Sequence, residues 1–578
     1  MDYIKNVLKN EKNQNILYIL LLSILFILFA VYIGHIYGNL YMDCGREAIL
    51  PELILKGKIL YKDIFGMYNP FSYQINALLY SIFGASLNTL YGAAYINALL
   101  FLVGIYFICK KFINGYYSFC IAFLLMCLYI FGCTGIVSYL YPYAFAFPYA
   151  VSFFTYSVYC FLNYIENGQK KNLYISALLM GLAFANKPEF LLCVIPALFI
   201  LHSKKESLKN YIIYILLCLL PVIISYVFLF IQGFSLNDLT NYIHFNINFF
   251  KSHEQNIYTS SFVFSPISEF SLKIIFENLI LFLTTVLGIA CYIAIAKKNT
   301  FLKLFVIFYS PLVLYFLYNT LYQNFYVNYF SWITIALLAV IYFYTSDKTK
   351  NTEGTMFLFL AASALLSMIR INFLPIFKGS CAIYMLLPII TVWIFFIKTD
   401  IKYFQKIKYK LYISLSLIII GAVNIAVVKN VEIPSMELKT AKGTIVQRQS
   451  DIQMFHNIEN WIKDNTTKDD SVLVLPEGTM MNFLTDRPTK PLYYHLIPNH
   501  IAAIGEANIV KGLNADKPDY IVLTNLKYDM YGKGQLCIDY GQKICDFIKS
   551  NYTQKQEFNV PQSSGEPFIA FIYKKIKK

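Results

Sequence analysis

The sequence predicts a polytopic α-helical membrane protein with a small soluble α/β domain at its C-terminal end. Of its 578 residues, 58% are hydrophobic and only 14% are charged, whereas a soluble globular chain carries charges at about a quarter of its positions. The mean hydropathy is +0.53, and the apolar residues gather in long runs. These three observations exclude a single water-soluble domain.

Apolar runs of about 20 residues match the length that a helix needs to cross a hydrocarbon core of about 30 Å. By this measure we expect about thirteen transmembrane helices, over residues 15–37, 87–109, 116–136, 146–165, 172–186, 189–203, 211–232, 275–296, 301–319, 325–345, 355–374, 380–397 and 410–428. The runs on either side of Lys187, Pro188 and Glu189 are short, and either two tilted helices or one hairpin fits them.

The excess of positive charge belongs to the membrane part. The net charge is +15, but residues 430–578 carry 18 basic and 17 acidic side chains. Most lysines of the apolar part lie in short tracts on one side of the predicted spans. The positive-inside rule therefore places the N-terminus in the cytoplasm and the C-terminal residues outside the cytoplasmic membrane. Because no soluble face carries a basic patch, we expect no nucleic-acid partner.

We therefore divide the chain into a transmembrane module, residues 1–428, and an extracytoplasmic α/β domain, residues 429–578. In the latter, helical patterns at 451–463, 504–513 and 538–548 alternate with strand patterns at 471–476, 520–523, 556–560 and 568–573. This alternation predicts a partly parallel sheet. The spacing leaves open whether Cys537 and Cys545 form a disulfide.

The outer loop at 38–86 carries the strongest candidates for chemistry, with four acidic and four basic side chains beside apolar ones. This pattern predicts an interfacial helix over residues 43–56, interrupted before Pro51, with its charges turned to water. Asp43 and Glu47 would stand one turn apart with Arg46 beside them. Two such carboxylates could activate a hydroxyl or hold a divalent cation. The alternative is a solvated helix with ordinary ion pairs.

The second outer loop, residues 233–274, contains His253 and Glu254. Together with Asp43 or Glu47, these two side chains could form a divalent-metal site. The alternative is that both are simply solvated.

Several motifs resemble those of GT-C membrane glycosyltransferases, in the bacterial branch similar to protein O-mannosyltransferases and lipid A aminoarabinose transferases. The strongest lie in the first outer loop: DCGRE at 43–47, GKILYKDIF at 57–65 and YNPFSYQINALLY at 68–80. Weaker likenesses are GLAFANKPE at 181–189, and in the soluble part SVLVLPEGTMMNFLTDRP at 471–488 and KPDYIVLTN at 517–525.

This resemblance implies a GT-C fold and an inverting transfer of a sugar, a hexose or a pentose, from a polyprenyl-phosphate donor in the lipid bilayer to an acceptor hydroxyl. The acceptor could be a glycan, a lipid or a protein. By the resemblance, Asp43 corresponds to the catalytic base and Asp63 to a second acid. A polyprenyl-linked glycan polymerase or ligase, and a lipid-linked sugar transporter or flippase, are the alternatives.

One departure from the family pattern concerns the lipid phosphate. Many relatives have Lys-Pro-Pro where this chain has Tyr68, Asn69 and Pro70, so their phosphate-binding lysine is missing. The cations expected to replace it are Lys187 and Arg370, because both lie near predicted outer span ends. We assign Arg46, Tyr68 and Asn69 to the same substrate-binding region.

Overall fold

The computed structural model describes residues 10–33, 39–131, 139–140, 144–251, 351–367, 435–490, 492–529, 532–562 and 565–576, and scattered positions between 387 and 421. The predicted spans at 275–296, 301–319 and 325–345 lie outside the described residues. So do three of the predicted site residues, His253, Glu254 and Arg370.

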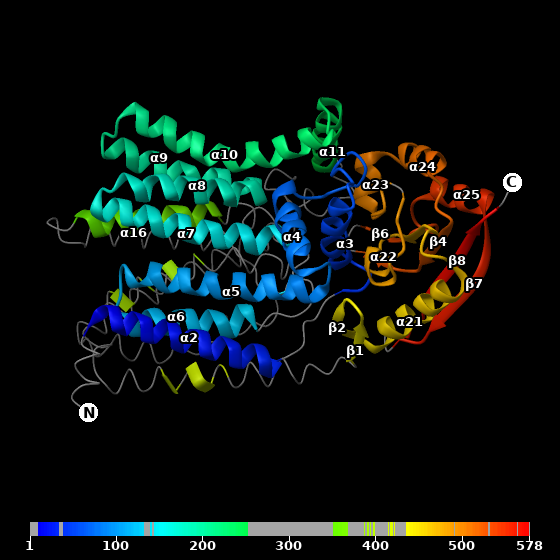
Figure 1. Cartoon of the computed structure of the whole chain (residues 1–578), viewed down its shortest axis with the longest axis horizontal. Helices are drawn as coiled ribbons and strands as arrows, with labels where there is room; N and C mark the ends of the chain where they lie inside the picture. The colour runs from blue at the N-terminus through cyan, green and yellow to red at the C-terminus, as the bar shows by residue number, and fades with distance from the viewer. Residues whose placement is uncertain are drawn as a thin grey trace, which may run out of the picture.

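A bundle of helices forms one half of the molecule (Figure 1). Its described members are α2 (Glu11–Ile33), α5 (Leu87–Lys110), α6 (Gly115–Leu125), α7 (Ala146–Asn167), α8 (Lys170–Asn186), α9 (Val194–Ser203), α10 (Leu208–Gln232) and α16 (Asn351–Ser367). Among described residues, three helices are long and apolar enough to cross a membrane: Glu11–Tyr32, Leu87–Lys110 and Leu208–Gln232. The expected total of thirteen stays a prediction.

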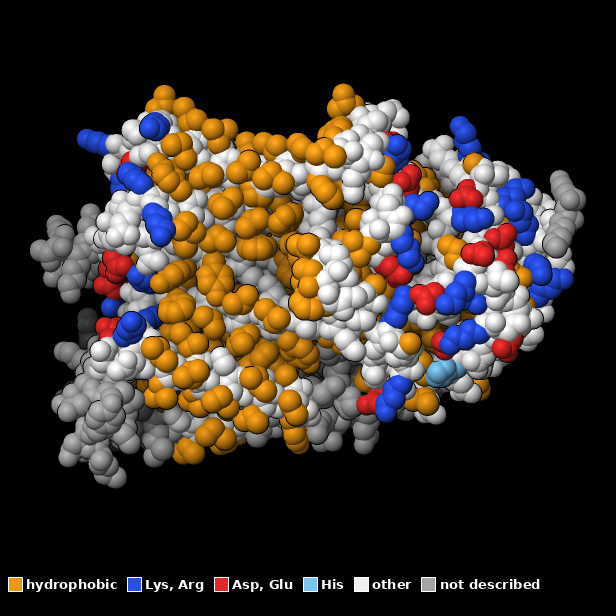
Figure 2. All heavy atoms as spheres, in the orientation of Figure 1, with side chains coloured by type: hydrophobic (Ala, Val, Ile, Leu, Met, Phe, Trp, Pro, Cys, Tyr) orange, Lys and Arg blue, Asp and Glu red, His pale blue; other side chains and the backbone are white. Residues whose placement is uncertain are grey.

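The surface of the bundle is a broad apolar band. Charged side chains gather on the C-terminal domain and at the end of the bundle that lies away from it (Figure 2). On α10, Leu216, Ile224 and Ile231 are exposed by 58%, 57% and 78%. At the far end, Lys110 pairs with Glu11 at 2.5 Å. A band of exposed apolar side chains between charged ends is typical of a helical bundle that lies in a bilayer.

Helix α8 ends at Asn186, and the chain turns through a short 3-10 helix, η3 (Pro188–Cys193), into α9. Pro188 lacks the N–H that a continuing helix would need, and it disfavours helical geometry at Lys187. Lys170, at the start of α8, pairs with Glu206, which follows α9. Helices α8 and α9 are therefore joined by a tight turn, and the choice between two tilted spans and one hairpin stays a prediction.

Helices α3 (Cys44–Leu55), α4 (Pro70–Phe83) and α11 (Leu236–Lys251) lie between the bundle and the C-terminal domain (Figure 1). The predicted interruption before Pro51 is wrong, because α3 continues through this residue. The predicted exposure of its charges is also wrong: nine of its twelve residues are buried, including Arg46 and Glu47. Packing on both sides replaces the lipid and water that the sequence pattern suggested.

The C-terminal domain contains a four-stranded sheet in the order β3 (Val472–Leu475), β4 (Tyr520–Thr524), β8 (Phe568–Lys575) and β7 (Tyr552–Val560). The β3–β4 pair is parallel and the other two pairs are antiparallel, which confirms the predicted partly parallel sheet. Helices α21 (Gln449–Asn465), α24 (Glu506–Ala515) and α25 (Gln542–Asn551) confirm the three predicted helices. Cys537 and Cys545 form a disulfide.

Four parts of this domain were not predicted. They are the hairpin of β1 (Ser435–Thr440) and β2 (Gly443–Arg448), helix α22 (Thr479–Thr485), helix α23 (Pro498–Ile504), and the small pair of β5 (Lys527–Tyr528) and β6 (Lys533–Gln535). The hairpin reaches the bundle, because the Tyr91 hydroxyl of α5 donates to the Thr444 carbonyl at 2.9 Å. These short elements bring the domain onto the helices.

The domain docks on α3 through a close approach of two backbones. A Cβ added to Gly45 in α3 would lie 2.2 Å from the Met480 nitrogen of α22, so only glycine fits there. One hydrophobic cluster includes Leu50 and Leu53 of α3 together with Met480 and Phe483 of α22. The domain and α3 therefore share a core.

Gly45→Ala should separate these elements, because the new methyl group has no room against the α22 backbone. We expect a cost of about 1–3 kcal/mol in the free energy of unfolding, seen as a lower Tm and faster proteolytic release of the C-terminal domain. The matched control is Gly512→Ala in α24, where an added Cβ meets nothing within 4 Å. That change should stabilise slightly, since alanine favours a helix over glycine. Equal effects of the two changes would contradict the docking.

Candidate active site

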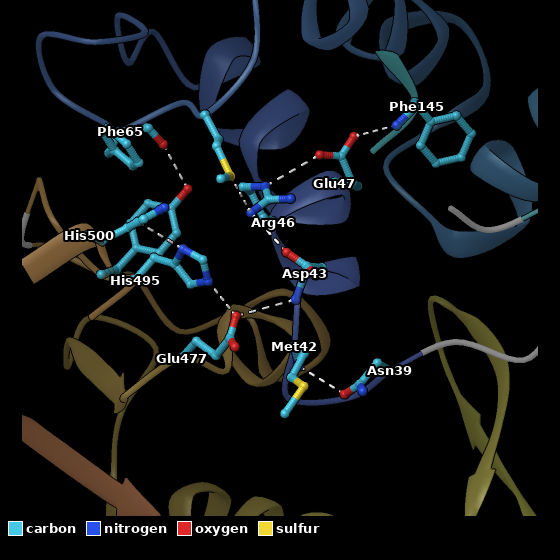
Figure 3. A network of polar contacts seen from close by, with 12 residues as sticks. Asn39, Met42, Asp43, Arg46, Glu47, Phe65, Phe145, Glu477, His495 and His500 are labelled. Atoms are coloured by element: carbon cyan, nitrogen blue, oxygen red, sulfur yellow. Dashed lines mark hydrogen bonds and ion pairs between the residues drawn. The ribbon is translucent and has the colours of Figure 1, made fainter. Parts of the chain in front are cut away.

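The start of α3 presents three charged side chains to the seam between bundle and C-terminal domain. The Asn39 side-chain oxygen accepts hydrogen bonds from the Tyr41 and Met42 backbone N–H groups at 2.9 and 2.8 Å. These bonds fix the backbone turn that leads into α3. Asp43 follows with φ 46°, in the left-handed region that non-glycine residues rarely occupy. This turn directs Asp43 toward Arg46 (Figure 3).

Arg46 lies between two carboxylates. Its Nη1 is 3.1 Å from Asp43 Oδ1, and its Nε is 3.4 Å from Glu47 Oε1. Arg46 and Glu47 are 3% and 0% exposed, whereas the Asp43 side chain is 26% exposed. The predicted clustering of these three residues is therefore confirmed, and Asp43 is the most accessible of them.

Burial dominates the electrostatics of both carboxyl groups. It raises the pKa of Glu47 to about 7, against the opposing effects of Arg46 and of the Phe145 N–H, which donates to Glu47 Oε2 at 2.9 Å. Burial also raises the pKa of Asp43; Arg46 opposes this, and the Glu477 carboxylate adds to it. Asp43 consequently holds a proton more readily than an exposed aspartate would.

The C-terminal domain contributes a second set of polar side chains that sequence reasoning missed. Glu477, just after β3, accepts a hydrogen bond from the Asp43 backbone N–H at 3.4 Å and lies 2.5 Å from His495 Nε2. The Tyr528 hydroxyl donates to the other Glu477 oxygen at 2.5 Å. His495 in turn contacts His500, with the two Nδ1 atoms 3.1 Å apart. Burial raises the pKa of Glu477. The neighbouring His495 and the hydrogen bonds from His495 and Tyr528 outweigh burial, so the pKa of Glu477 lies below its ordinary value.

On the bundle side, two cations contact the Tyr68 ring. Arg46 Cζ is 5.4 Å and Lys187 Nζ is 4.6 Å from its centroid. Lys187 is 3% exposed, lies 3.7 Å from the Phe147 ring centroid and 3.6 Å from Glu189 Oε1. The turn at 187–188, between α8 and η3, positions this lysine, so the structure brings the predicted Arg46, Tyr68 and Lys187 together.

Two other predicted residues bind backbone groups outside this cluster. Asp63 Oδ2 accepts a hydrogen bond from the Ile59 backbone N–H at 2.8 Å, which stabilises its own turn. The Asn69 side-chain amide donates to the Phe184 carbonyl at 3.4 Å and ties this turn to α8. No contact described for Asp63 joins it to Asp43, so its role as a second acid stays a prediction.

One group of side chains in the described part of the chain has the geometry to hold a metal ion. A ligand atom from each of Asp43, Glu477 and His495 lies within 4.8 Å of the other two. Two carboxylates and one imidazole suit a divalent cation. The ligands proposed from the sequence, His253 and Glu254, lie outside the described residues.

Residues 69–230 match the family described as dolichyl-phosphate-mannose-protein mannosyltransferase. This confirms the resemblance to that branch of GT-C glycosyltransferases over a stretch that runs from α4 to α10 and includes Lys187. The matched stretch is less than a third of the chain and begins after Asp43. No curated protein sequence matches the chain.

The chain is also similar to two proteins of known structure. The oligosaccharyltransferase of Archaeoglobus fulgidus in its apo form is 10% identical, with a TM-score of 0.49 over 96% of this chain and 74% of the other. ArnT from Cupriavidus metallidurans, bound to undecaprenyl phosphate, is 10% identical, with a TM-score of 0.42 over 96% and 97%. Both TM-scores lie below 0.5.

The raised pKa of Glu47 gives a prediction for stability. Its value in the folded protein is about 7 against an ordinary 4.5, so the folded state holds the proton more tightly. The free energy of unfolding should then fall as pH rises from about 4.5 to about 7 and level off above, by at most roughly 3 kcal/mol. Glu47→Gln, which keeps an acceptor for the Phe145 N–H, should lose most of this fall. Melting curves in detergent between pH 5 and 8 measure it, and parallel curves for parent and variant would contradict it.

Proposed function

We propose that this protein transfers a sugar from a polyprenyl-phosphate donor to an acceptor hydroxyl, with inversion, at the outer face of the cytoplasmic membrane. The observation that carries the proposal is the position of Asp43. This partly exposed carboxylate lies at the seam between an apolar bundle and a soluble domain, in contact with Arg46 at 3.1 Å. The match of residues 69–230 to the mannosyltransferase family supports the same reaction class.

Asp43 acts as the general base. It accepts the proton of the acceptor hydroxyl while that oxygen attacks the anomeric carbon of the sugar. The bond between the anomeric carbon and the phosphate oxygen breaks, and polyprenyl phosphate leaves with the electron pair. A single displacement of this kind inverts the anomeric centre and requires one essential carboxylate. The acceptor is a glycan, a lipid or a protein.

Arg46 and Lys187 bind the lipid phosphate. They lie on the same aromatic ring, Tyr68, so a phosphate beside this ring can contact both. Their positive charge stabilises the negative charge that grows on the leaving phosphate, which lowers the barrier. The prenyl chain then extends along the apolar surface of the bundle, where the side chains of α10 are exposed. With the site at the outer face of the membrane, the N-terminus lies in the cytoplasm.

Asp43→Asn should slow transfer by about 10²–10⁴-fold, because asparagine cannot accept the hydroxyl proton. The assay supplies the purified full chain with labelled polyprenyl-phosphate sugars and measures release of polyprenyl phosphate together with glycosylated product. The matched control is Glu52→Gln in the same loop, where the side chain keeps an oxygen for its partner Lys56, 2.7 Å away in the parent, and which should retain most activity. Parent-like rates for Asp43→Asn would rule out this base.

Lys187→Met should weaken donor binding while it keeps the packing of the side chain against Phe147. The loss of one charged contact to phosphate corresponds to roughly 1.5–3 kcal/mol, so we expect the KM for the donor to rise at least tenfold. The control is Lys56→Met, since Lys56 is 60% exposed and pairs with Glu52 at 2.7 Å. An unchanged KM in the Lys187 variant would show that other cations hold the phosphate.

A further inference from the structure

We propose that the C-terminal domain binds an acidic glycan, a sugar chain that carries carboxylate or phosphate groups, in a groove on its side away from the bundle. Two adjoining hollows of about 580 and 740 Å³ form this distal groove. Small-molecule sites occupy roughly 300–1,000 Å³, so each hollow is large enough for a ligand. The residues common to both hollows are Asn465, Tyr520, Lys574, Lys575 and Ile576.

The distal groove lies at the end of the sheet opposite to Asp43. Strands β3 and β4 run in parallel toward Glu477, whereas Tyr520 is the first residue of β4 and Lys574 lies at the end of the antiparallel β8. The stretch from Val472, which pairs with Tyr520, to Glu477 covers on the order of 15 Å in extended chain. Figure 1 shows the end of β8 on the side of the domain away from the bundle. The distal groove is therefore separate from the candidate active site.

Lysines outnumber acidic residues in the lining of the distal groove. The four lysines are Lys517, Lys555, Lys574 and Lys575. Residues 430–578 as a whole carry 18 basic and 17 acidic side chains, so this excess is local. Lysine ammonium groups bind phosphate and carboxylate through charge-assisted hydrogen bonds, and a local excess of them favours an anionic ligand.

Both acidic side chains of the distal groove are occupied by the domain itself. Asp519 Oδ2 accepts hydrogen bonds from the Ser471 N–H and hydroxyl at 3.0 and 2.7 Å. Asp470 Oδ2 accepts from the Thr467 N–H and hydroxyl at 2.7 and 2.9 Å. These bonds hold the two carboxylates in their own turns, so they do not neutralise the lysines by direct pairing.

Two aromatic rings lie beside these cations. The half-buried Trp461 of α21 meets the Tyr520 ring edge to face, with 5.8 Å between the centroids. The Tyr520 hydroxyl donates to the Asn465 carbonyl at 3.2 Å, which fixes the ring against α21. Lys574 Nζ lies 5.3 Å from the Tyr520 centroid. A ring and an ammonium group therefore stand side by side, as a ligand with an apolar face and an acid group requires.

This combination selects a sugar chain among anionic ligands. The C–H face of a sugar ring packs on an aromatic side chain, and the exposed hydroxyls of Ser550 and Thr553 line the same groove. A nucleic acid would instead need a long basic track with successive rings on which its bases stack. The domain is nearly neutral overall, and its two groove rings cross at 73°, so they do not form such a series.

The test titrates the purified full chain in detergent, without any sugar donor, with an oligogalacturonate and with a neutral maltooligosaccharide of equal length. Trp461 is one of three tryptophans in the chain, so its fluorescence reports binding, and calorimetry gives the stoichiometry. We expect one acidic oligosaccharide per chain and at least tenfold weaker binding of the neutral one. Added NaCl should weaken the acidic ligand further, because exposed charges are screened by salt.

Lys574→Met combined with Lys575→Met should weaken the oligogalacturonate at least tenfold, since methionine keeps the packing on Tyr520 and removes the charge. Trp461→Leu should abolish the fluorescence change and weaken binding. The matched control is Lys439→Met on β1, outside the distal groove, where the lysine is 79% exposed. Asp43→Asn should bind like the parent, so failure of this inference can be told apart from failure of the proposed reaction.

Three results would overturn the assignment. They are equal binding of the neutral oligosaccharide, equal binding of a single-stranded oligonucleotide or of poly-glutamate with the same number of charges, and an equal loss in the Lys439 variant. Should the Trp461 variant misfold, as its Tm would show, the titration of the parent and of the two surface-lysine variants decides.

Discussion

The contact between α3 and α22 at Gly45 is the constraint on which the candidate site depends. Two backbones meet where any larger residue would collide with the Met480 nitrogen. Because Glu477 precedes α22 and Asp43 precedes α3, this contact brings the two carboxylates to the same place. The core shared by the two helices therefore fixes the geometry of a site whose parts come from distant regions of the chain.

The parts that the sequence predicted are those with local signals. Long apolar runs indicated the bundle, and the alternating helices and strands of residues 451–573 indicated the sheet, because hydrophobic periodicity depends on neighbouring residues. The spacing of Asp43, Arg46 and Glu47 likewise placed them on one turn. The loop was wrongly expected in water and lipid, since its apolar residues pack on the C-terminal domain and a local pattern cannot distinguish these surroundings.

Glu477, His495 and His500 were missed for a related reason. They lie in the C-terminal domain and meet Asp43 only through the tertiary fold, so no spacing in the sequence connects them. One signal was present: Glu477 directly follows a buried strand that pairs in parallel with β4, and the carboxyl ends of parallel strands often carry functional residues. Helix α22, which begins two residues later, was not predicted, so Glu477 was not among the candidate residues.

The two sides of the candidate site carry different chemical groups. Lys187 comes from the bundle side and brings positive charge beside the Tyr68 ring, whereas Glu477 and His495 come from the C-terminal domain and bring groups that can ligate a metal. The Asp43–Arg46 pair lies between them, with 3.1 Å between its atoms. A lipid-borne phosphate approaching along the bundle would meet the cations first. In the proposed reaction, an acceptor that approaches from the side of the domain would reach the donor at the Asp43–Arg46 pair.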